Sequence, residues 1–189
     1  MLRPDRCPPS RRRLADFEQA LTASFALVEL AAPDCRGGSM ELREFFSEEF
    51  INLSLKGKSK DTVLKELISL LGVTEKSEGI LFKMLKRREN LGSTGIGRGI
   101  AIPHARSLVV SRLRVAFGRK AAGIDFKAID NNPVHYFFLI VAPPLEVSNQ
   151  YLPVLGNIAQ LSRAPETPER LAAIETPQEF LDLLSNKSV

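Results

Sequence analysis

The segment VHYFFLIVAPP, residues 134–144, constrains the fold of this chain more than any other feature. Every residue from Tyr136 to Ala142 is apolar, so a strand built from them has two apolar faces. Such a strand is stable in a sheet that is covered on both sides, and it is far too short to span a membrane as a helix. The segment therefore predicts a central strand in a layered α/β domain.

Neighbouring segments predict the helices and strands that would cover and extend this sheet. SKDTVLKELISLLG predicts a helix that ends at Gly72, with one apolar face made of Val63, Leu64, Leu67, Ile68, Leu70 and Leu71. EGILFKMLKRREN predicts a second, with Ile80, Leu81, Met84 and Leu85 turned inward. INLSLK and LRVAFG predict strands, and YLPVLGNIAQLS predicts a helix. TPQEFLDLLS predicts a last helix that Thr176 caps, with Glu179 completing a capping box.

Composition and charge exclude several classes of protein. Hydrophobic residues make up 44% of the chain, enough for a core, and the net charge is only +4. The basic clusters at residues 11–13 and 83–88 are too sparse to indicate nucleic-acid binding. The two cysteines, Cys7 and Cys35, show no metal-ligand spacing with the two histidines. We therefore expect a cytoplasmic protein without metal, cofactor or membrane insertion.

The chain divides at Met40. Residues 1–39 are rich in Pro and Arg, then in Ala and Leu, whereas a regular pattern starts at Met40. The RGGS sequence just before Met40 reads like a translated ribosome-binding site. We therefore expect Met40 to be the natural start, and residues 1–39 to be an extension that is either unstructured or not part of the natural protein. A genuine helix around Leu14 to Leu30 is the alternative. Residues 40–189 are expected to form a single domain.

The stretch GSTGIGRGIAIPHARS, residues 92–107, is the main candidate site. It does not fit a mononucleotide loop, because Arg98 and Gly99 stand where Lys and Ser/Thr are required, and Ile100 breaks the dinucleotide pattern. Glycines can instead expose backbone N–H groups to an anion, here at Gly95, and Ser93 and Thr94 add hydroxyl donors.

Downstream of these donors lies His104, and Arg88 stands upstream. A neutral imidazole is a nucleophile near pH 7 and can carry a phosphoryl group, whose charge an arginine fork would neutralise. The alternative is a purely structural histidine in a glycine-rich turn. The residues alone leave both interpretations open.

RRENLGSTGIGRGIAIPHARS closely resembles the active-site segment of type-2 enzyme IIA domains of the phosphoenolpyruvate-dependent phosphotransferase system. AGIDFKAIDNNPVHYFFLIVAPP, residues 122–144, matches a second block. The resemblance covers Met40 to the C-terminus. It implies an α/β fold with a mixed central sheet flanked by helices on both faces. It also implies that His104 receives a phosphoryl group from an HPr-type protein, that Arg88 lies near it, and that the loop of Ser93 and Thr94 belongs to the site.

One position departs from the family pattern. Many members carry a second histidine at the start of the helix after the APP turn, where this chain has Tyr151. A tyrosine can donate one hydrogen bond but does not become a cation at pH 7, so onward transfer of the phosphoryl group is in question. His135 shares a strand face with Phe137, Leu139 and Val141, and we expect it to be a buried structural residue.

These observations favour a phosphocarrier of the nitrogen-regulatory IIA kind, which would pass phosphate to a separate chain or signal to a regulated partner. The first alternative is a sugar-specific, fructose- or mannitol-type IIA component that passes phosphate to a IIB cysteine. The second is a binding module that keeps the fold without phosphotransfer, which Tyr151 suggests.

Overall fold

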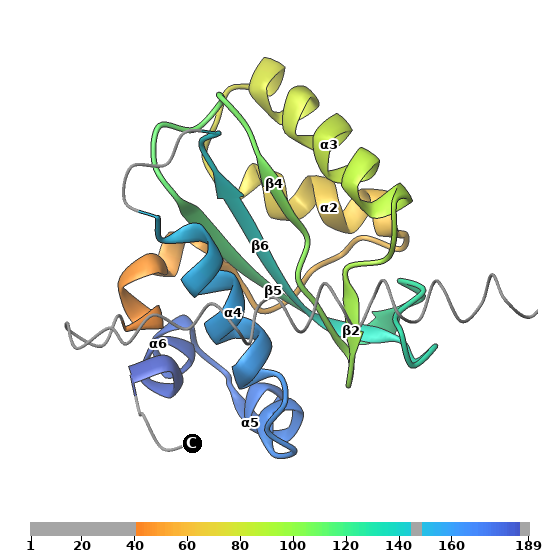
Figure 1. The fold of residues 1–189 in the computed structure, drawn as a ribbon. Helices are drawn as coiled ribbons and strands as arrows, with labels where there is room; N and C mark the ends of the chain where they lie inside the picture. Colours follow the sequence, from red (N-terminus) through yellow and green to blue (C-terminus); the bar gives the residue numbers. More distant parts are fainter. Residues whose placement is uncertain (1–40, 145–148, 186–189) are drawn as a thin grey trace, which may run out of the picture. The chain divides into compact units, whose positions relative to one another are not determined.

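The computed structural model describes residues 41–144 and 149–185, drawn in colour in Figure 1. The strands are β1 (Ile51–Asn52), β2 (Gly95–Gly97), β3 (Ile100–Ala101), β4 (His104–Arg106), β5 (Arg114–Ile124) and β6 (Val134–Ala142). The helices are α2 (Lys60–Ser69), α3 (Glu75–Asn90), α4 (Tyr151–Leu161), α5 (Thr167–Ala173) and α6 (Pro177–Ser185), and two 3-10 turns, η1 (Leu42–Phe45) and η2 (Glu48–Phe50), precede β1. The predictions for residues 1–39, Cys7 and Cys35 included, lie outside the described residues.

The six strands form one mixed sheet in the order β1-β5-β6-β3-β2, with β4 also paired to β6. β5 runs antiparallel to β6, whereas β3 and β4 both run parallel to it. β3 and β4 follow each other along one edge of β6, since Ile100 lies opposite Tyr136 and His104 lies opposite Ile140. The interruption between them falls at residues 102–103, so His104 begins a new strand directly after Pro103.

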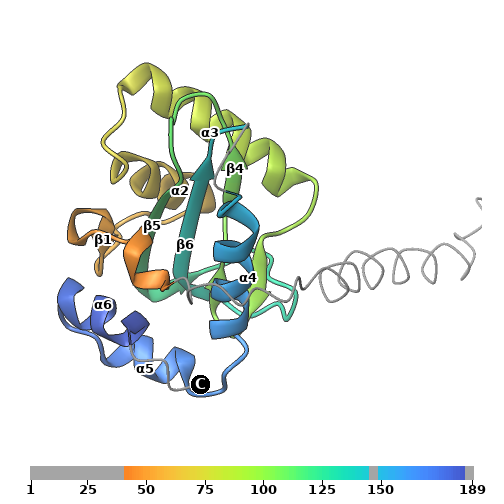
Figure 2. The same cartoon turned by 60° about the vertical axis from the view of Figure 1, so that its left-hand side comes forward.

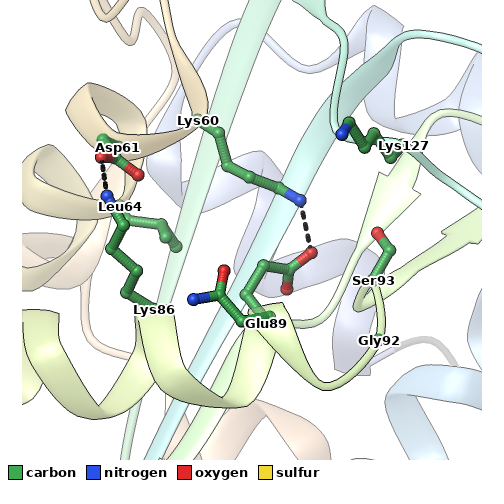
Figure 3. A pocket seen from close by; sticks show the side chains of 9 residues that line it. Lys60, Asp61, Leu64, Lys86, Glu89, Gly92, Ser93 and Lys127 are labelled. Carbon is green, nitrogen blue, oxygen red and sulfur yellow. Dashed lines mark hydrogen bonds and ion pairs between the residues drawn. The ribbon is translucent and has the colours of Figure 1, made fainter.

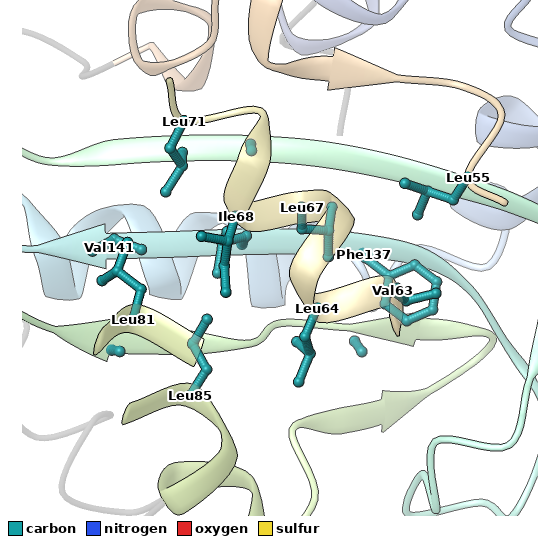
Figure 4. Packing of buried hydrophobic residues seen from close by; sticks show 14 of the residues in the cluster. Leu55, Val63, Leu64, Leu67, Ile68, Leu71, Leu81, Leu85, Phe137 and Val141 are labelled. Carbon is teal, nitrogen blue, oxygen red and sulfur yellow. The ribbon is translucent and has the colours of Figure 1, made fainter. Parts of the chain in front are cut away.

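Helices cover both faces of the sheet, as the apolar β6 predicts. α2 and α3 lie on one side, and α4, α5 and α6 lie on the other (Figures 1 and 2). Phe137 on β6 packs in the α2–α3 cluster, which Figure 4 shows from close by. Its neighbour Phe138 packs in the opposite cluster with Phe180 of α6. The predicted α/β fold is therefore confirmed.

The predicted helix faces are confirmed for α2 and only half correct for α3. The four predicted inward residues on α2, Val63, Leu64, Leu67 and Ile68, are fully buried. Leu71, just after the helix, is buried too, whereas Leu70, its C-cap, is partly exposed. On α3, Leu81 and Leu85 are buried, but Ile80 and Met84 are 42% and 36% exposed. The buried stripe of α3 is therefore only one residue wide per turn, which is narrower than the predicted face of four residues.

Two further details differ from the sequence-based expectation. The strand predicted from INLSLK is only two residues long, because the Asn52 side chain accepts a hydrogen bond from the Ser54 N–H and turns the chain. At α6 the Thr176 hydroxyl accepts from the Glu179 N–H, as a cap should, but the Glu179 carboxylate accepts mainly from the Glu175 N–H, one residue before the cap, and more weakly from the Thr176 N–H. None of the helices in the described residues is long and apolar enough to cross a membrane.

Candidate active site around His104

His104 lies where the open edge of the sheet meets two helices. It is the first residue of β4, and its side chain is half-buried. Arg88, in the last turn of α3, approaches from one side of the sheet. Tyr151, the first residue of α4, approaches from the other. The fold thus brings together three residues that the sequence analysis assigned to the site.

The two ring nitrogens of His104 have different partners. Nδ1 lies 2.8 Å from the carbonyl oxygen of Ile102, and Nε2 lies 3.1 Å from Nε of Arg88. A carbonyl oxygen only accepts, so Nδ1 carries the proton. In the neutral ring Nε2 then holds the lone pair, which the Arg88 N–H can meet as a donor. The tautomer fixed in this way presents Nε2 as the nucleophile.

The surroundings keep the His104 ring neutral. Burial lowers its pKa below the ordinary value of 6.5, and this is the largest influence; the neighbouring Arg88 cation lowers it further. The Ile102 carbonyl and the Glu89 carboxylate act in the opposite direction, but the net pKa remains lowered. His104 is therefore unprotonated and available as a nucleophile at neutral pH.

Arg88 is held at two points of its guanidinium group. Its Nε donates to His104, and its Nη1 donates to the carbonyl oxygen of Gly92 at 3.0 Å. The second contact ties the side chain to the loop that follows α3. A cation held beside a nucleophilic nitrogen can stabilise an anionic group that the nitrogen attacks.

The three loop residues expected to bind phosphate have other partners in this structure. The Ser93 hydroxyl donates to the Phe126 carbonyl oxygen at 2.8 Å and accepts from the Gly95 N–H at 3.1 Å. The Thr94 hydroxyl donates to the Glu89 carboxylate at 2.6 Å, and Thr94 is only 4% exposed. In this structure these groups shape the loop, and direct binding of phosphate by Ser93, Thr94 and Gly95 stays a prediction.

The glycines also have structural explanations. A Cβ at Gly95 would lie 2.8 Å from the Ala128 backbone, so the close approach is to the protein itself. Gly97, Arg98 and Gly99 all have positive φ angles, of 92°, 54° and 73°, and they form the tight turn between β2 and β3. The glycine-rich stretch thus builds a hairpin that leads the chain into Pro103 and His104.

Glu89 is a residue of the site that the sequence analysis missed. Its side chain is buried beside Arg88, and its carboxylate forms an ion pair of 2.6 Å with Lys60 of α2. Figure 3 shows this pair in a pocket that Lys86, Ser93 and other residues also line. The sequence shows that Glu89 directly follows Arg88. It does not show that the Glu89 carboxylate is buried, nor which residues pair with it.

Arg106 is the second missed residue. It lies two positions after His104 on β4, so both side chains point to the same face of the strand. The centre of its guanidinium group lies 4.7 Å from the centroid of the Tyr151 ring, and its Nη1 donates to the Pro144 carbonyl oxygen at 3.3 Å. The Tyr151 and His104 rings are 6.4 Å apart, centroid to centroid. A cation therefore stacks on the tyrosine at the start of α4, next to His104.

His135 does not join the site. On β6 it precedes Ile140, the partner of His104, by five residues, a separation of about 17 Å along the strand. Its Nδ1 lies within 3.2 Å of the Lys120 and Ala121 carbonyl oxygens, and its ring fills the space above Gly123. The structure agrees with a structural role, although the residue is half-buried rather than buried. Within residues 41–144 and 149–185, no three His, Cys, Asp or Glu side chains gather into a metal-binding group.

Comparison with known proteins places this geometry in a family. The chain is 31% identical over 148 residues to the fructose-specific EIIABC component of the phosphotransferase system from Bacillus subtilis; this covers 77% of the chain and only 23% of that longer protein. It is 32% identical over 147 residues to the nitrogen regulatory protein of Bradyrhizobium diazoefficiens, which covers 77% of the chain and 95% of the relative.

The fold agrees with these sequence matches. The crystal structure of nitrogen regulatory protein IIA-Ntr from Neisseria meningitidis superposes with a TM-score of 0.69 at 30% identity, over 76% of this chain and 98% of the other. The sequence profile of the family described as "Phosphoenolpyruvate-dependent sugar phosphotransferase system, EIIA 2" matches residues 44–187. The chain therefore belongs to the type-2 enzyme IIA family of the phosphoenolpyruvate-dependent sugar phosphotransferase system.

Proposed function

We propose that this protein is a phosphocarrier that accepts a phosphoryl group on Nε2 of His104 from an HPr-type protein. The observation that carries the proposal is the pair of contacts on one ring: the Ile102 carbonyl oxygen holds the proton on Nδ1, and Arg88 meets the lone pair of Nε2. These contacts keep Nε2 of His104 as a neutral nucleophile beside the Arg88 guanidinium before a phosphoryl donor binds. Membership of the phosphotransferase family supports the same reaction.

The transfer balances without a metal or a cofactor. The Nε2 lone pair attacks the phosphorus atom of the donor's phosphohistidine, the new N–P bond forms, and the old one breaks. The bonding electrons return to the donor's ring nitrogen. The guanidinium of Arg88 then moves from Nε2 to the phosphoryl oxygens, where its fork matches their geometry. The first turn of α4, beside His104, adds the positive end of a helix dipole.

One relative and one residue of this chain favour the nitrogen-regulatory subtype, and a second relative favours the sugar-specific one. The nitrogen regulatory protein of Bradyrhizobium diazoefficiens matches along 95% of its own length, and in this chain Tyr151 stands at the family's second-histidine position. We therefore favour a regulatory, cytoplasmic IIA protein whose phosphorylation state is passed to a partner. The alternative is a sugar-specific IIA that passes phosphate to the cysteine of a IIB protein, as the fructose-specific relative's name suggests.

Incubation with phosphoenolpyruvate, enzyme I and HPr tests the proposal. Mass spectrometry should detect one added phosphate that is lost on brief acid treatment, as expected for phosphohistidine, and His104→Ala should abolish the gain. A properly folded wild-type chain that gains no phosphate would instead support the remaining alternative, a binding module that has kept the fold and lost the chemistry.

A further inference from the structure

We propose that Glu89 is a positioning residue for the transfer, because its carboxylate connects the structure on both sides of the His104 ring. One side is the Arg88 guanidinium at Nε2, and the other is the Ile102 carbonyl oxygen at Nδ1. This inference rests on the proposed function, since it assigns a role within the same site.

The Glu89 carboxylate is saturated with donors. Oε1 accepts from Lys60 Nζ at 2.6 Å, both oxygens accept from the Thr94 N–H at 3.1 Å, and Oε2 accepts from the Thr94 hydroxyl at 2.6 Å. Glu89 is 8% exposed. A charged acceptor that is buried and fully paired is rigid, because any shift leaves charge without a partner.

A continuous chain of contacts leads from Glu89 to Nδ1 of His104. The carboxylate holds Thr94 by its N–H and its hydroxyl. The carbonyl oxygen of Thr94 then accepts from the Ile102 N–H at 2.9 Å. The carbonyl oxygen of the same Ile102 accepts the proton of Nδ1 at 2.8 Å. The orientation of the group that selects the tautomer thus depends on the loop that Glu89 fixes.

A second, shorter connection leads to Nε2. Glu89 follows Arg88 directly at the C-terminal end of α3, and its carboxylate ties this end to Lys60, the first residue of α2. The close-up in Figure 3 shows Lys60 and Glu89 reaching toward each other across the pocket. The last turn of α3, which carries Arg88, is thereby joined to α2 as well as to the loop. A helix end without this tie would fray, and Arg88 would lose its fixed position.

The test compares Glu89→Leu, which has a similar volume and accepts nothing, with Glu89→Gln, whose amide oxygen can still accept from Thr94. Glu66→Leu is the matched control: the Glu66 carboxylate also anchors a backbone N–H, that of Lys56 at 2.8 Å, but it has no connection to His104. Three quantities are measured for each variant. They are the initial rate of phosphorylation by phospho-HPr, the tautomer of His104 from its ring ¹⁵N shifts, and the pKa of His104 from the same signals.

We expect Glu89→Leu to lower the rate by about 10- to 100-fold, the cost of misplacing groups around a reacting atom. The ring should change from a single tautomer to a mixture, and Glu89→Gln should recover most of the rate. The direction of the pKa change is diagnostic. Loss of the Glu89 charge alone would lower the pKa of His104, whereas loss of the Arg88 contact would raise it. A rise therefore reports that Arg88 has moved.

A folded Glu89→Leu protein with parental rate, tautomer and pKa would overturn the proposal. A slower rate with an unchanged tautomer and pKa would also overturn it, because the loss of rate would then not arise from a change at the His104 ring. If Glu89→Leu does not fold, Thr94→Val, which removes only the hydroxyl, takes its place, with a smaller loss of rate expected and an unchanged tautomer as the contrary result. The ring measurements need no phosphate, so they remain decisive even if wild-type His104 is never phosphorylated.

Discussion

Replacement of Arg88 by glutamine is the perturbation whose effect can be worked out most fully from the structure. Arg88 makes two side-chain hydrogen bonds, to Nε2 of His104 at 3.1 Å and to the Gly92 carbonyl oxygen at 3.0 Å. The shorter, neutral glutamine removes the cation beside the nucleophile. It also removes both hydrogen bonds: the one to Nε2 of His104, which can pass to the phosphoryl group, and the one to Gly92, which holds the loop.

The expected losses in rate and in stability differ greatly. Removing one donor that faces developing negative charge typically costs about 10²- to 10³-fold in rate, and we expect this loss for phosphorylation of His104. Each hydrogen bond contributes about 1 kcal/mol to folding, so stability should fall by at most about 2 kcal/mol. For a chain of this size that is a decrease of about 4–8 °C in melting temperature.

The assay measures initial phosphorylation rates with phospho-HPr alongside melting temperature. Arg87→Gln is the control, because Arg87 carries the same charge in the same helical turn but is exposed. It should phosphorylate at close to the parental rate. If Arg88→Gln is folded and as fast as Arg87→Gln, the inferred role of Arg88 at the reacting group is wrong.

Four further predictions concern the pKa of His104, the role of His135, the role of Tyr151 and the contribution of residues 1–39. The pKa of His104 is lowered in the folded chain, so the unfolded chain binds a proton first as pH falls below 6.5, and the stability of the fold should decline there. For the same reason the phosphorylation rate should fall only below pH 6.5. A rate that already falls above pH 6.5 would contradict the environment assigned to His104. His135→Gln should lower the melting temperature but keep most of the labelling, since its contacts are structural; loss of labelling in a folded variant would place it in the site. Tyr151→His should speed discharge of phosphate to a IIB domain with little change in uptake; a wild type that discharges as fast as it charges would remove the main support for the regulatory assignment. A chain that begins at Met40 should retain labelling and melt within a few degrees of the full chain, whereas a large decrease in melting temperature would show that residues 1–39 contribute to stability.

The central sheet could be predicted because one strand leaves little choice. β6 is apolar at every position from Tyr136 to Ala142, and only a sheet with two covered faces accommodates such a strand. The apolar periodicity of α2 was equally informative. α3 was less so, because Ile80 and Met84 satisfy the helical pattern although they lie at the exposed margin of the stripe.

The candidate site was only partly predictable. His104 and Arg88 carry a chemistry that residue types reveal. The contacts of Gly95 and Thr94 do not follow from the sequence in the same way: a glycine that allows close approach to a ligand looks the same as one that allows close approach to Ala128. A hydroxyl that could meet phosphate looks the same as one bonded to Glu89. The ring tautomer depends on a carbonyl orientation set by tertiary hydrogen bonds, which no local pattern encodes.

Identification of the phosphorylated nitrogen tests the central claim most directly. The chain, labelled with ¹⁵N in its histidine rings, is phosphorylated through enzyme I and HPr, and the nitrogen bonded to phosphorus is assigned from ring ¹⁵N shifts and their coupling to ³¹P. Because the Ile102 carbonyl oxygen holds the proton on Nδ1, we predict a single phosphohistidine, His104, with phosphorus on Nε2. Phosphorus on Nδ1 of His104, or on any other residue, would contradict the account.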